Sequence, residues 1–487
     1  MSFYLYDITF LVIFTLFVVL FLYKRRANLK KEGIMFLYRT QVGVKFINHV
    51  GTKYKKSLKV FSFLAIISGY ILMAVMMYLL GRLIYIYLFV PEVVRAIKIP
   101  PLMPLIPYLP EVFKIDFLPS FYFTYWIIAI ACIAIFHEFA HGIIAKSYGI
   151  KIKTTGFGFL GPFLAAFVES DEKQMESKSK FQQIAVLSAG TFANLILAFL
   201  FFLLLALFFT IAFVPAGAMF NVYATQQIPI NSITNIGGTK ITTPTSENII
   251  YIINNNNLED TFELGSNGNS VKLTKITANN KSYYMALDIL ENQLKVNSNN
   301  VYLYLDTDAI KKQLRGSIIQ IDDIQITNHE DISNALKNYN PGQTVKITTR
   351  TSEGILEYEI KLIEHPLYEN QPMIGIGYGV SNTGIMSKVL GFFTFYKEQG
   401  TDYKPKFNID FIEFIYDLIW WLALINLSVA LVNMWPVAIF DGGRMFMLTV
   451  WAITGSEKFA QLSFKIITYL ILGSLVLLMF GWAFAFF

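Results

Sequence analysis

Two histidines and a glutamate stand close together in an otherwise apolar stretch of this sequence. His137 and His141 are four residues apart, and Glu138 directly follows the first of them. On a helix, residues four apart lie on one face, so both imidazoles can bind one metal ion while the carboxylate stands beside it. The spacing therefore predicts a zinc-binding helix with a glutamate placed to act as a general base. The alternative is a histidine pair at a helix end that reaches to the membrane interface.

The surrounding sequence favours the metal site. Residues 121–135 are almost wholly apolar, and ionisable groups are costly in such a segment, so they indicate function. Two histidines leave a catalytic zinc one protein ligand short. Asp441 is the favoured third ligand, because no further candidate for a zinc ligand is embedded in apolar sequence. The alternative is an interfacial aspartate that pairs with Arg444. A single cysteine, Cys132, excludes a cysteine-rich zinc module.

The composition is that of a polytopic membrane protein. Of the 487 residues, 54% are hydrophobic and only 15% are charged, which is too apolar for an ordinary soluble domain. About six transmembrane helices are expected, since a span needs about 20 apolar residues. They are expected at residues 3–23, 60–80, 121–144, 184–214, 418–435 and 466–487. The first lacks a basic start and a cleavage site, so we interpret it as a retained helix rather than a signal peptide.

Basic residues between positions 24 and 59 predict the orientation in the membrane. Glu32 is the only acid in this loop, and the positive-inside rule makes such a loop cytoplasmic. The active site then lies in the membrane near the cytoplasmic face, most simply in the cell membrane. The position beside a membrane helix favours contact with lipid headgroups, so no nucleic-acid partner is expected.

Glycines interrupt the apolar sequence that follows the histidines. They are Gly156, Gly158 and Gly161, and a proline follows the last of them. A segment with this composition is a poor helix, but it could form a re-entrant hairpin buried in protein. The alternative is a plain interfacial loop. In the next span, Asn194 follows several small residues. Small residues allow close helix packing, and an asparagine at this depth needs a polar partner.

Residues 215–388 differ from the rest, with short β-branched runs separated by Asn, Gly, Asp and Thr. This pattern predicts an inserted soluble α+β domain outside the membrane. Residues 232–242 are echoed by residues 317–327, and each copy leads into a helix-start signal. The second copy closely resembles PDZ domains and the first does so loosely. A generic β-sandwich with chance similarity is the alternative.

The chain is thus expected to divide into four parts. Residues 1–57 hold the first helix and the basic loop, and residues 58–214 hold the zinc-binding helix and the re-entrant segment. The inserted domain covers residues 215–388, with one or two PDZ-like lobes at about 220–295 and 300–365. Residues 389–487 return to the membrane and carry Asp441.

The two membrane motifs together resemble the site-2 protease family of intramembrane zinc metalloproteases. The family's His-Glu-x-x-His pattern matches residues 137–141, and its Asn-x-x-Pro-x-x-x-x-Asp-Gly pattern matches Asn433 to Gly442. Two departures are mild. Phe440 stands where leucine is usual, and Thr191 stands where the family often has proline.

The resemblance implies a Zn²⁺ ion held by His137, His141 and Asp441, with Glu138 as general base. It also suggests that Asn433 binds substrate backbone or the developing oxyanion. The remaining candidates for substrate binding are Asn194 and the glycine-rich edge formed by Gly156, Gly158 and Gly161.

The implied substrate is a transmembrane helix of another membrane protein, already shortened on the outer side. The PDZ-like insertion would act as a size filter in such regulated intramembrane proteolysis. The rival interpretation is a non-hydrolytic zinc-binding transporter or sensor. A transporter has no need of Glu138, whereas a protease does, so the intact motif favours the protease.

Overall fold

The computed structural model consists of two compact units. The helical unit contains Met1–Phe208 and Asp410–Phe487, and the β-rich unit contains Phe209–Ile409. The residues that the structure describes are 3–26, 29–32, 35–90, 94, 100–101, 103–113, 115, 118–160, 163–255, 258–265, 271–296, 299–379, 391 and 394–486.

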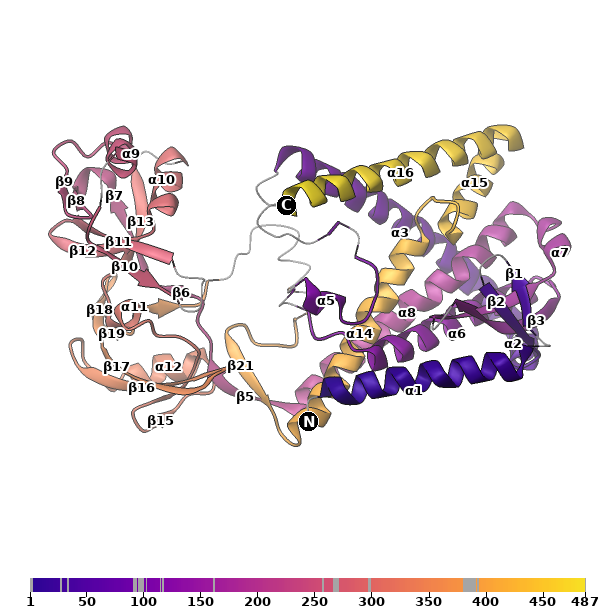
Figure 1. Ribbon diagram of the computed structural model, residues 1–487, viewed down its shortest axis with the longest axis horizontal. Coiled ribbons are helices and arrows are strands. Elements are labelled where there is room, and N and C mark those ends of the chain that lie inside the picture. Colours follow the sequence, from indigo (N-terminus) through magenta and orange to yellow (C-terminus); the bar gives the residue numbers. More distant parts are fainter. Residues whose placement is uncertain are drawn as a thin grey trace. The chain divides into compact units, whose positions relative to one another are not determined.

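Six helices in the described residues are long and apolar enough to cross a membrane, in agreement with the prediction. They are α1 (Phe3–Lys24), α3 (Lys55–Phe89), α6 (Phe123–Ser147), α8 (Lys180–Ala212), α14 (Ile409–Asn433) and α16 (Glu457–Phe486) (Figure 1). Each predicted span overlaps one of them, although α3 extends well beyond residues 60–80 at both ends. Helices are the natural form for such sequences, because lipid offers no partner to free backbone groups.

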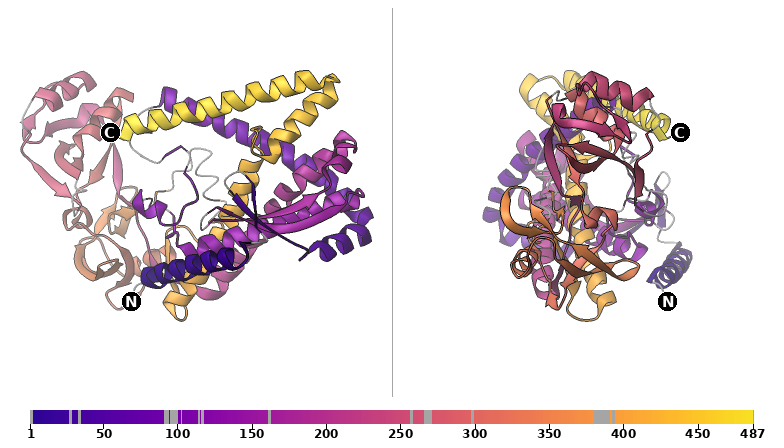
Figure 2. Two further views of the ribbon diagram at one scale, coloured as in Figure 1. Left: turned by 45° about the vertical axis from the view of Figure 1, so that its right-hand side comes forward. Right: turned by 90° about the vertical axis from the view of Figure 1, so that its left-hand side faces the viewer.

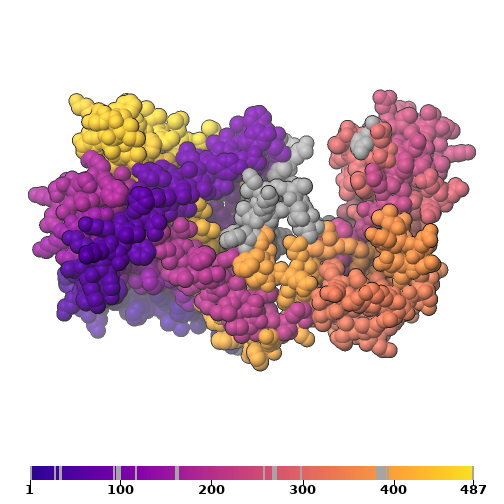
Figure 3. All heavy atoms as spheres, turned by 180° about the vertical axis from the view of Figure 1, so that it is seen from behind, coloured from indigo at the N-terminus to yellow at the C-terminus, as the bar shows by residue number. Residues whose placement is uncertain are grey.

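Shorter helices also lie in the described part of the helical unit. They are α2 (Val44–Lys53), α5 (Leu109–Val112), α7 (Glu172–Glu176) and α15 (Asp441–Thr454). Helices α15 and α16 form a hairpin that turns at Gly455, whose φ is 69° (Figure 2). Helix α3 lies beside α16 and crosses one face of the unit (Figure 3). The α14–α15–α16 segment therefore brings Asp441 back toward the other membrane helices.

A four-stranded antiparallel sheet occupies the region that the sequence predicted as a basic loop and a re-entrant segment. Its strands are β1 (Leu29–Glu32), β2 (Met35–Thr40), β3 (Ile152–Leu160) and β4 (Phe163–Ser170), in that order. The basic loop prediction was therefore incomplete. Residues 36–40 of this loop pair with β3, and the amphipathic helix α2 packs on α6.

Helix α6, which carries the histidines, is anchored at its start by a carboxylate from α1. Asp7 is only 1% exposed and accepts hydrogen bonds from the backbone N–H groups of Phe123 (2.7 Å) and Thr124 (2.8 Å). These are free N–H groups of the first turn of α6. The single acid in the first apolar span is thus a helix cap supplied by a neighbouring helix.

The described part of the β-rich unit contains two large hydrophobic cores and a smaller cluster around Leu273 and Ile310. One large core is built around Ile233, Ile276 and Leu290, and the other large core around Ile318 and Ile347. The strands of the first lobe and its helices are β7 (Thr225–Pro229), β8 (Ile233–Ile236), β9 (Thr239–Lys240), α9 (Ser246–Asn255), β10 (Thr261–Leu264), β11 (Val271–Ala278), β12 (Lys281–Met285), α10 (Leu287–Val296) and β13 (Asn300–Leu305). They form one sheet in the order β7-β13-β12-β11-β8-β9, with β10 on β11.

The second lobe is built on the sheet β17-β16-β14-β5-β21, with β15 on β14. Its elements are β5 (Phe213–Ala218), β6 (Val222–Tyr223), α11 (Asp308–Lys311), β14 (Ser317–Ile321), β15 (Ile324–Gln325), α12 (His329–Leu336), β16 (Thr344–Thr351), β17 (Gly354–Lys361), β18 (Ile363–His365), β19 (Tyr368–Met373), β20 (Ile376–Gly377) and β21 (Thr401–Pro405). Because β21 pairs with β5, this unit extends past residue 388.

The internal echo in the sequence corresponds to a repeated local structure. In the first copy the β8–β9 hairpin precedes α9, and in the second the β14–β15 hairpin precedes α12. The predicted helix start at Asn328 is a side-chain cap, since its Oδ1 accepts from the backbone N–H of Asp331 at 3.0 Å. Each lobe thus contains one hairpin-and-helix repeat.

Candidate metal centre

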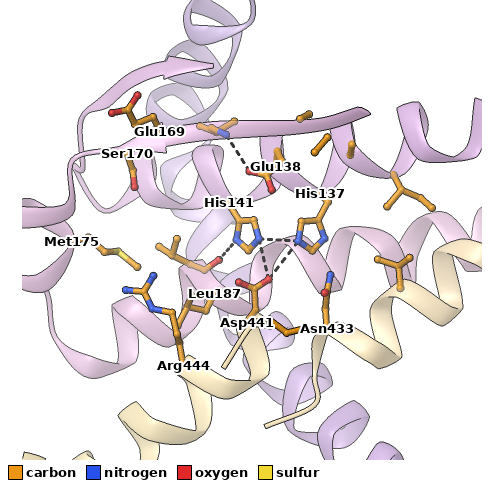
Figure 4. Close-up of a pocket in the computed structure, with 18 of the residues that line it drawn as sticks. His137, Glu138, His141, Glu169, Ser170, Met175, Leu187, Asn433, Asp441 and Arg444 are labelled. Carbon is orange, nitrogen blue, oxygen red and sulfur yellow. Dashed lines mark hydrogen bonds and ion pairs between the residues drawn. The ribbon is translucent and has the colours of Figure 1, made fainter. Parts of the chain in front are cut away.

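Three side chains from two helices converge on one point in the helical unit. His137 and His141 project from α6, and Asp441 is the first residue of α15 (Figure 4). The two histidine Nε2 atoms are 3.0 Å apart. Asp441 Oδ2 lies 3.4 Å from Nε2 of His137 and 3.3 Å from Nε2 of His141. One ligand atom from each residue therefore faces the same small space.

These separations fit a zinc ion. Zinc bonds to imidazole nitrogen and carboxylate oxygen are about 2.0–2.2 Å long, so two ligand atoms of a tetrahedral site are about 3.3–3.5 Å apart. The distances of 3.0, 3.3 and 3.4 Å are close to that range. Two imidazoles and one carboxylate are also a known ligand set for catalytic zinc, with the fourth position open.

The alternative in which Asp441 pairs with Arg444 does not describe this geometry. Within the described residues, the ion pairs of Asp441 are with His137 and His141. Asp441 begins α15 directly after the turn that follows Asn433, the last residue of α14. The Asn-x-x-Pro-x-x-x-x-Asp-Gly motif is thus a helix end, a turn and a helix start that directs the carboxylate at the histidines.

Helix α8 lies directly behind the two imidazoles. Nδ1 of His137 is 3.0 Å from the Asn194 amide, and Nδ1 of His141 is 2.6 Å from the backbone oxygen of Val186. Between these two contacts stands Gly190. A Cβ atom there would lie 2.4 Å from Nε2 of His141 and 2.6 Å from Nε2 of His137. Only glycine lets α8 approach the metal-facing atoms so closely.

The comparison with known proteins agrees with this geometry. Residues 125–479 match peptidase family M50, a stretch that includes both motifs. This chain belongs to peptidase family M50. The resemblance to the site-2 proteases, which form this family, is thereby confirmed. Together with the six apolar helices, the family places the chain among integral membrane proteins.

A relative is found in Methanocaldococcus jannaschii. It is an uncharacterized protein that is 31% identical over 192 residues, which are 38% of this chain and 47% of the relative. This chain thus spans about half the length of the curated relative that it matches.

Glu138 of this M50 chain stands beside the metal-binding group. Its Oε2 accepts a hydrogen bond from the backbone N–H of Val168 in β4 at 3.0 Å. The sequence predicted a carboxylate beside the ligands but gave no sign of the strand that holds it. Val168 could not have been found, because a backbone donor has no sequence signature.

A cavity of about 740 Å³ opens over this group in the M50 chain. His137, Glu138, His141 and Asp441 line it, together with Asn433. Along another wall lies strand β4, which contributes residues Leu164, Ala165, Ala166, Val168, Glu169 and Ser170. Asn433 lies on the side of the cavity formed by the end of α14 (Figure 4).

Glu169 carries a charge at the polar end of this wall. Its carboxylate accepts hydrogen bonds from the Thr154 hydroxyl at 2.8 Å and from Arg39 at 3.0 Å. These two donors lower the pKa of Glu169 below its usual value. The cavity therefore has a charged rim, at which Glu169 is paired with Arg39, as well as an apolar wall.

The glycines predicted to hold substrate lie elsewhere. Gly156 and Gly158 belong to β3, which pairs with β2 on one side and with β4 on the other. A strand with both edges paired cannot accept a substrate strand, so this prediction was wrong in its choice of strand. Packing explains why residue 156 is glycine, since a Cβ atom there would lie 2.4 Å from the Phe167 ring. Gly161 lies outside the described residues.

Asn194 also differs from its predicted role. It is fully buried, and its amide faces His137 rather than the cavity. This position does not fit a substrate-binding residue. Sequence reasoning noted the small residues near Asn194 but missed Gly190, which is one helical turn before it and could have been found from that spacing.

Proposed function

We propose that this chain is an intramembrane zinc metalloprotease that hydrolyses peptide bonds in transmembrane segments of other membrane proteins. The observation that carries the proposal is the convergence of His137, His141 and Asp441 at tetrahedral spacing. Glu138 stands next to this group on a helix that is long and apolar enough to cross the membrane. Family membership supports the same reaction class.

The residues divide the chemistry between them. His137, His141 and Asp441 would hold the zinc, which when bound lowers the pKa of a ligated water to about 7 and polarises the scissile carbonyl. Glu138 takes the proton from the attacking water and passes it to the leaving amine. Asn433, on the facing wall of the cavity, donates its amide N–H to the substrate carbonyl as charge develops there.

Strand β4 provides the surface for the substrate backbone. It is the last strand of its sheet, and its outer edge pairs with no strand in the described part of the chain. The Val168 N–H points from this edge toward Glu138, so the backbone of Ala166 and Leu164 points the same way. A helical substrate must unwind before attack, and the unwound segment would add to β4 as a further strand.

We further propose the arrangement predicted from the sequence for the rest of the chain. The basic residues 24–59 would face the cytoplasm, which places the active site near that side and residues 215–388 outside. The hairpin-and-helix repeat supports one PDZ-like lobe at about 220–295 and another at about 300–365. Such lobes would admit substrates already cut on the outer side, as in regulated intramembrane proteolysis.

The decisive experiment uses Glu138→Gln in the full chain, reconstituted in lipid vesicles with a membrane-embedded test helix. Glutamine keeps the size of the side chain but cannot take a proton, so cleavage should fall to background while bound zinc stays at the wild-type level. Undiminished cleavage with zinc bound would show the proposed mechanism to be wrong. A zinc-binding transporter or sensor is indicated instead if the wild-type chain binds zinc and cleaves no test helix.

A further inference from the structure

The second nitrogen of each metal-facing histidine is held by helix α8. For His141 the partner is the Val186 backbone oxygen, 2.6 Å from Nδ1. A carbonyl oxygen can only accept, so Nδ1 of His141 carries the hydrogen and Nε2 keeps its lone pair. A neutral imidazole has one donor and one acceptor nitrogen. This contact therefore fixes the tautomer that a metal at Nε2 requires.

The same requirement decides how the Asn194 amide is oriented. If Nε2 of His137 binds the metal, its Nδ1 carries the hydrogen and needs an acceptor. The amide atom placed 3.0 Å away is Nδ2, which cannot accept, while the buried Oδ1 has no partner in the described residues. Oxygen and nitrogen of an amide are assigned from the hydrogen-bond network. Turning the amide by half a turn gives both Nδ1 and Oδ1 a suitable partner.

We propose that Asn194 is a positioning residue of the metal site, whose Oδ1 accepts the Nδ1 hydrogen of His137 and holds Nε2 toward the metal. Asn194 is fully buried, so this contact has no competition from water. Helix α8 then orients both histidines, through a side chain for His137 and a backbone oxygen for His141. Partners of this kind typically strengthen metal binding by about 10-fold to 100-fold.

This inference rests on the metal site of the proposed function, and zinc affinity tests it without any measurement of cleavage. The full chain in detergent is stripped of metal and titrated with Zn²⁺ against a chromogenic chelator, and with Co²⁺ by visible absorption. Asn194→Ala should weaken Zn²⁺ binding by about 10-fold to 100-fold. Asn194→Asp should bind within a few-fold of wild type, because a carboxylate accepts the same hydrogen.

The aspartate variant separates positioning from packing. If the amide donated to Nδ1 through Nδ2, aspartate could not replace it, and Asn194→Asp would lose as much affinity as Asn194→Ala. That result, or wild-type affinity in Asn194→Ala, would overturn the proposal. Asn426 provides the matched control, since it is equally buried on a membrane helix and its amide donates, among the described residues, to Leu422 O of its own helix. Asn426→Ala and Asn426→Asp should leave the Co²⁺ spectrum unchanged.

The metal titration also keeps the two proposals distinguishable. Should Glu138→Gln cleave normally while Asn194→Ala loses zinc, the protease mechanism fails and the positioning role stands. If instead Glu138→Gln abolishes cleavage and Asn194→Ala binds zinc as tightly as wild type, only the positioning role of Asn194 is excluded.

Discussion

Substitution of Gly190 by alanine is expected to abolish metal binding while the chain stays folded. Gly190 lies on α8 between the contacts to His137 and His141. Its added Cβ would stand 2.4 Å from Nε2 of His141 and 2.6 Å from Nε2 of His137. Those two nitrogens are the atoms that face Asp441. The new methyl group would therefore occupy the space in which the metal is bound.

The size of the effect follows from the contact distances. An ordinary carbon–nitrogen contact is about 3.5 Å, so each imidazole would have to retreat by about 1 Å. Metal–ligand distances tolerate only about 0.2 Å. We therefore expect Zn²⁺ affinity to fall by more than about 100-fold, the upper end of the cost of losing an outer partner. Stability should change less, because overpacking costs about 1–3 kcal/mol and alanine returns about 1 kcal/mol of helix propensity.

The assay measures zinc content and thermal unfolding of the purified full chain in the same detergent. Gly473→Ala is the matched control, since a Cβ atom there meets nothing within 4 Å on the membrane helix α16. It should keep full zinc content. If Gly190→Ala also retained one tightly bound zinc per chain, the metal could not lie between the three proposed ligands, and the geometric reasoning would be refuted.

Two further predictions concern the edge strand and the β-rich unit. Ala166→Pro removes one outward N–H of β4 and should raise KM for a test helix by about fivefold to tenfold, since a hydrogen bond contributes about 1 kcal/mol. The control Ala166→Gly keeps this N–H. Equal KM values for the two variants would exclude strand addition. In the β-rich unit, the hydroxyl and backbone N–H of Thr327 lower the pKa of Asp331. A carboxyl group with a lowered pKa stabilises the folded state at pH values above its unfolded-state pKa of about 3.9. This stabilisation is lost as the pH falls through the lower pKa of the folded state. Asp331→Asn should therefore lower Tm at pH 7 and have a smaller effect at pH 3, measured by circular dichroism with Glu330→Gln as the control; an equal effect at both pH values would contradict this account.

The parts of the site that the sequence revealed are those with a rigid local spacing. His137 and His141 are four residues apart on one helix, and this spacing alone places both rings on one face. Asp441 could be found despite its distance in sequence, because an embedded carboxylate needs a partner and the histidines lacked a third ligand. The apolar spans were equally clear, since membrane helices leave a long, continuous signal.

The four-stranded sheet was missed because its signals conflict locally. Residues 35–38 are apolar and fit a strand, but they lie within a basic loop whose charges dominate the local composition. Their partner strand is more than a hundred residues away, and pairing over that distance leaves no local trace. The glycines of β3 then suggested a substrate edge, although Gly156 is explained by packing against Phe167 inside the sheet.

The role of α8 shows why spacing on one helix must be compared with spacing on its neighbour. Val186, Gly190 and Asn194 are four residues apart in turn, so they form one stripe along α8. His137 contacts the later end of this stripe and His141 the earlier end, so the two helices run in opposite directions. The stripe thus repeats the four-residue step of the histidine pair, with a polar group opposite each ring and glycine between them. A search for such matched stripes in membrane sequences would find the positioning residues together with the metal ligands.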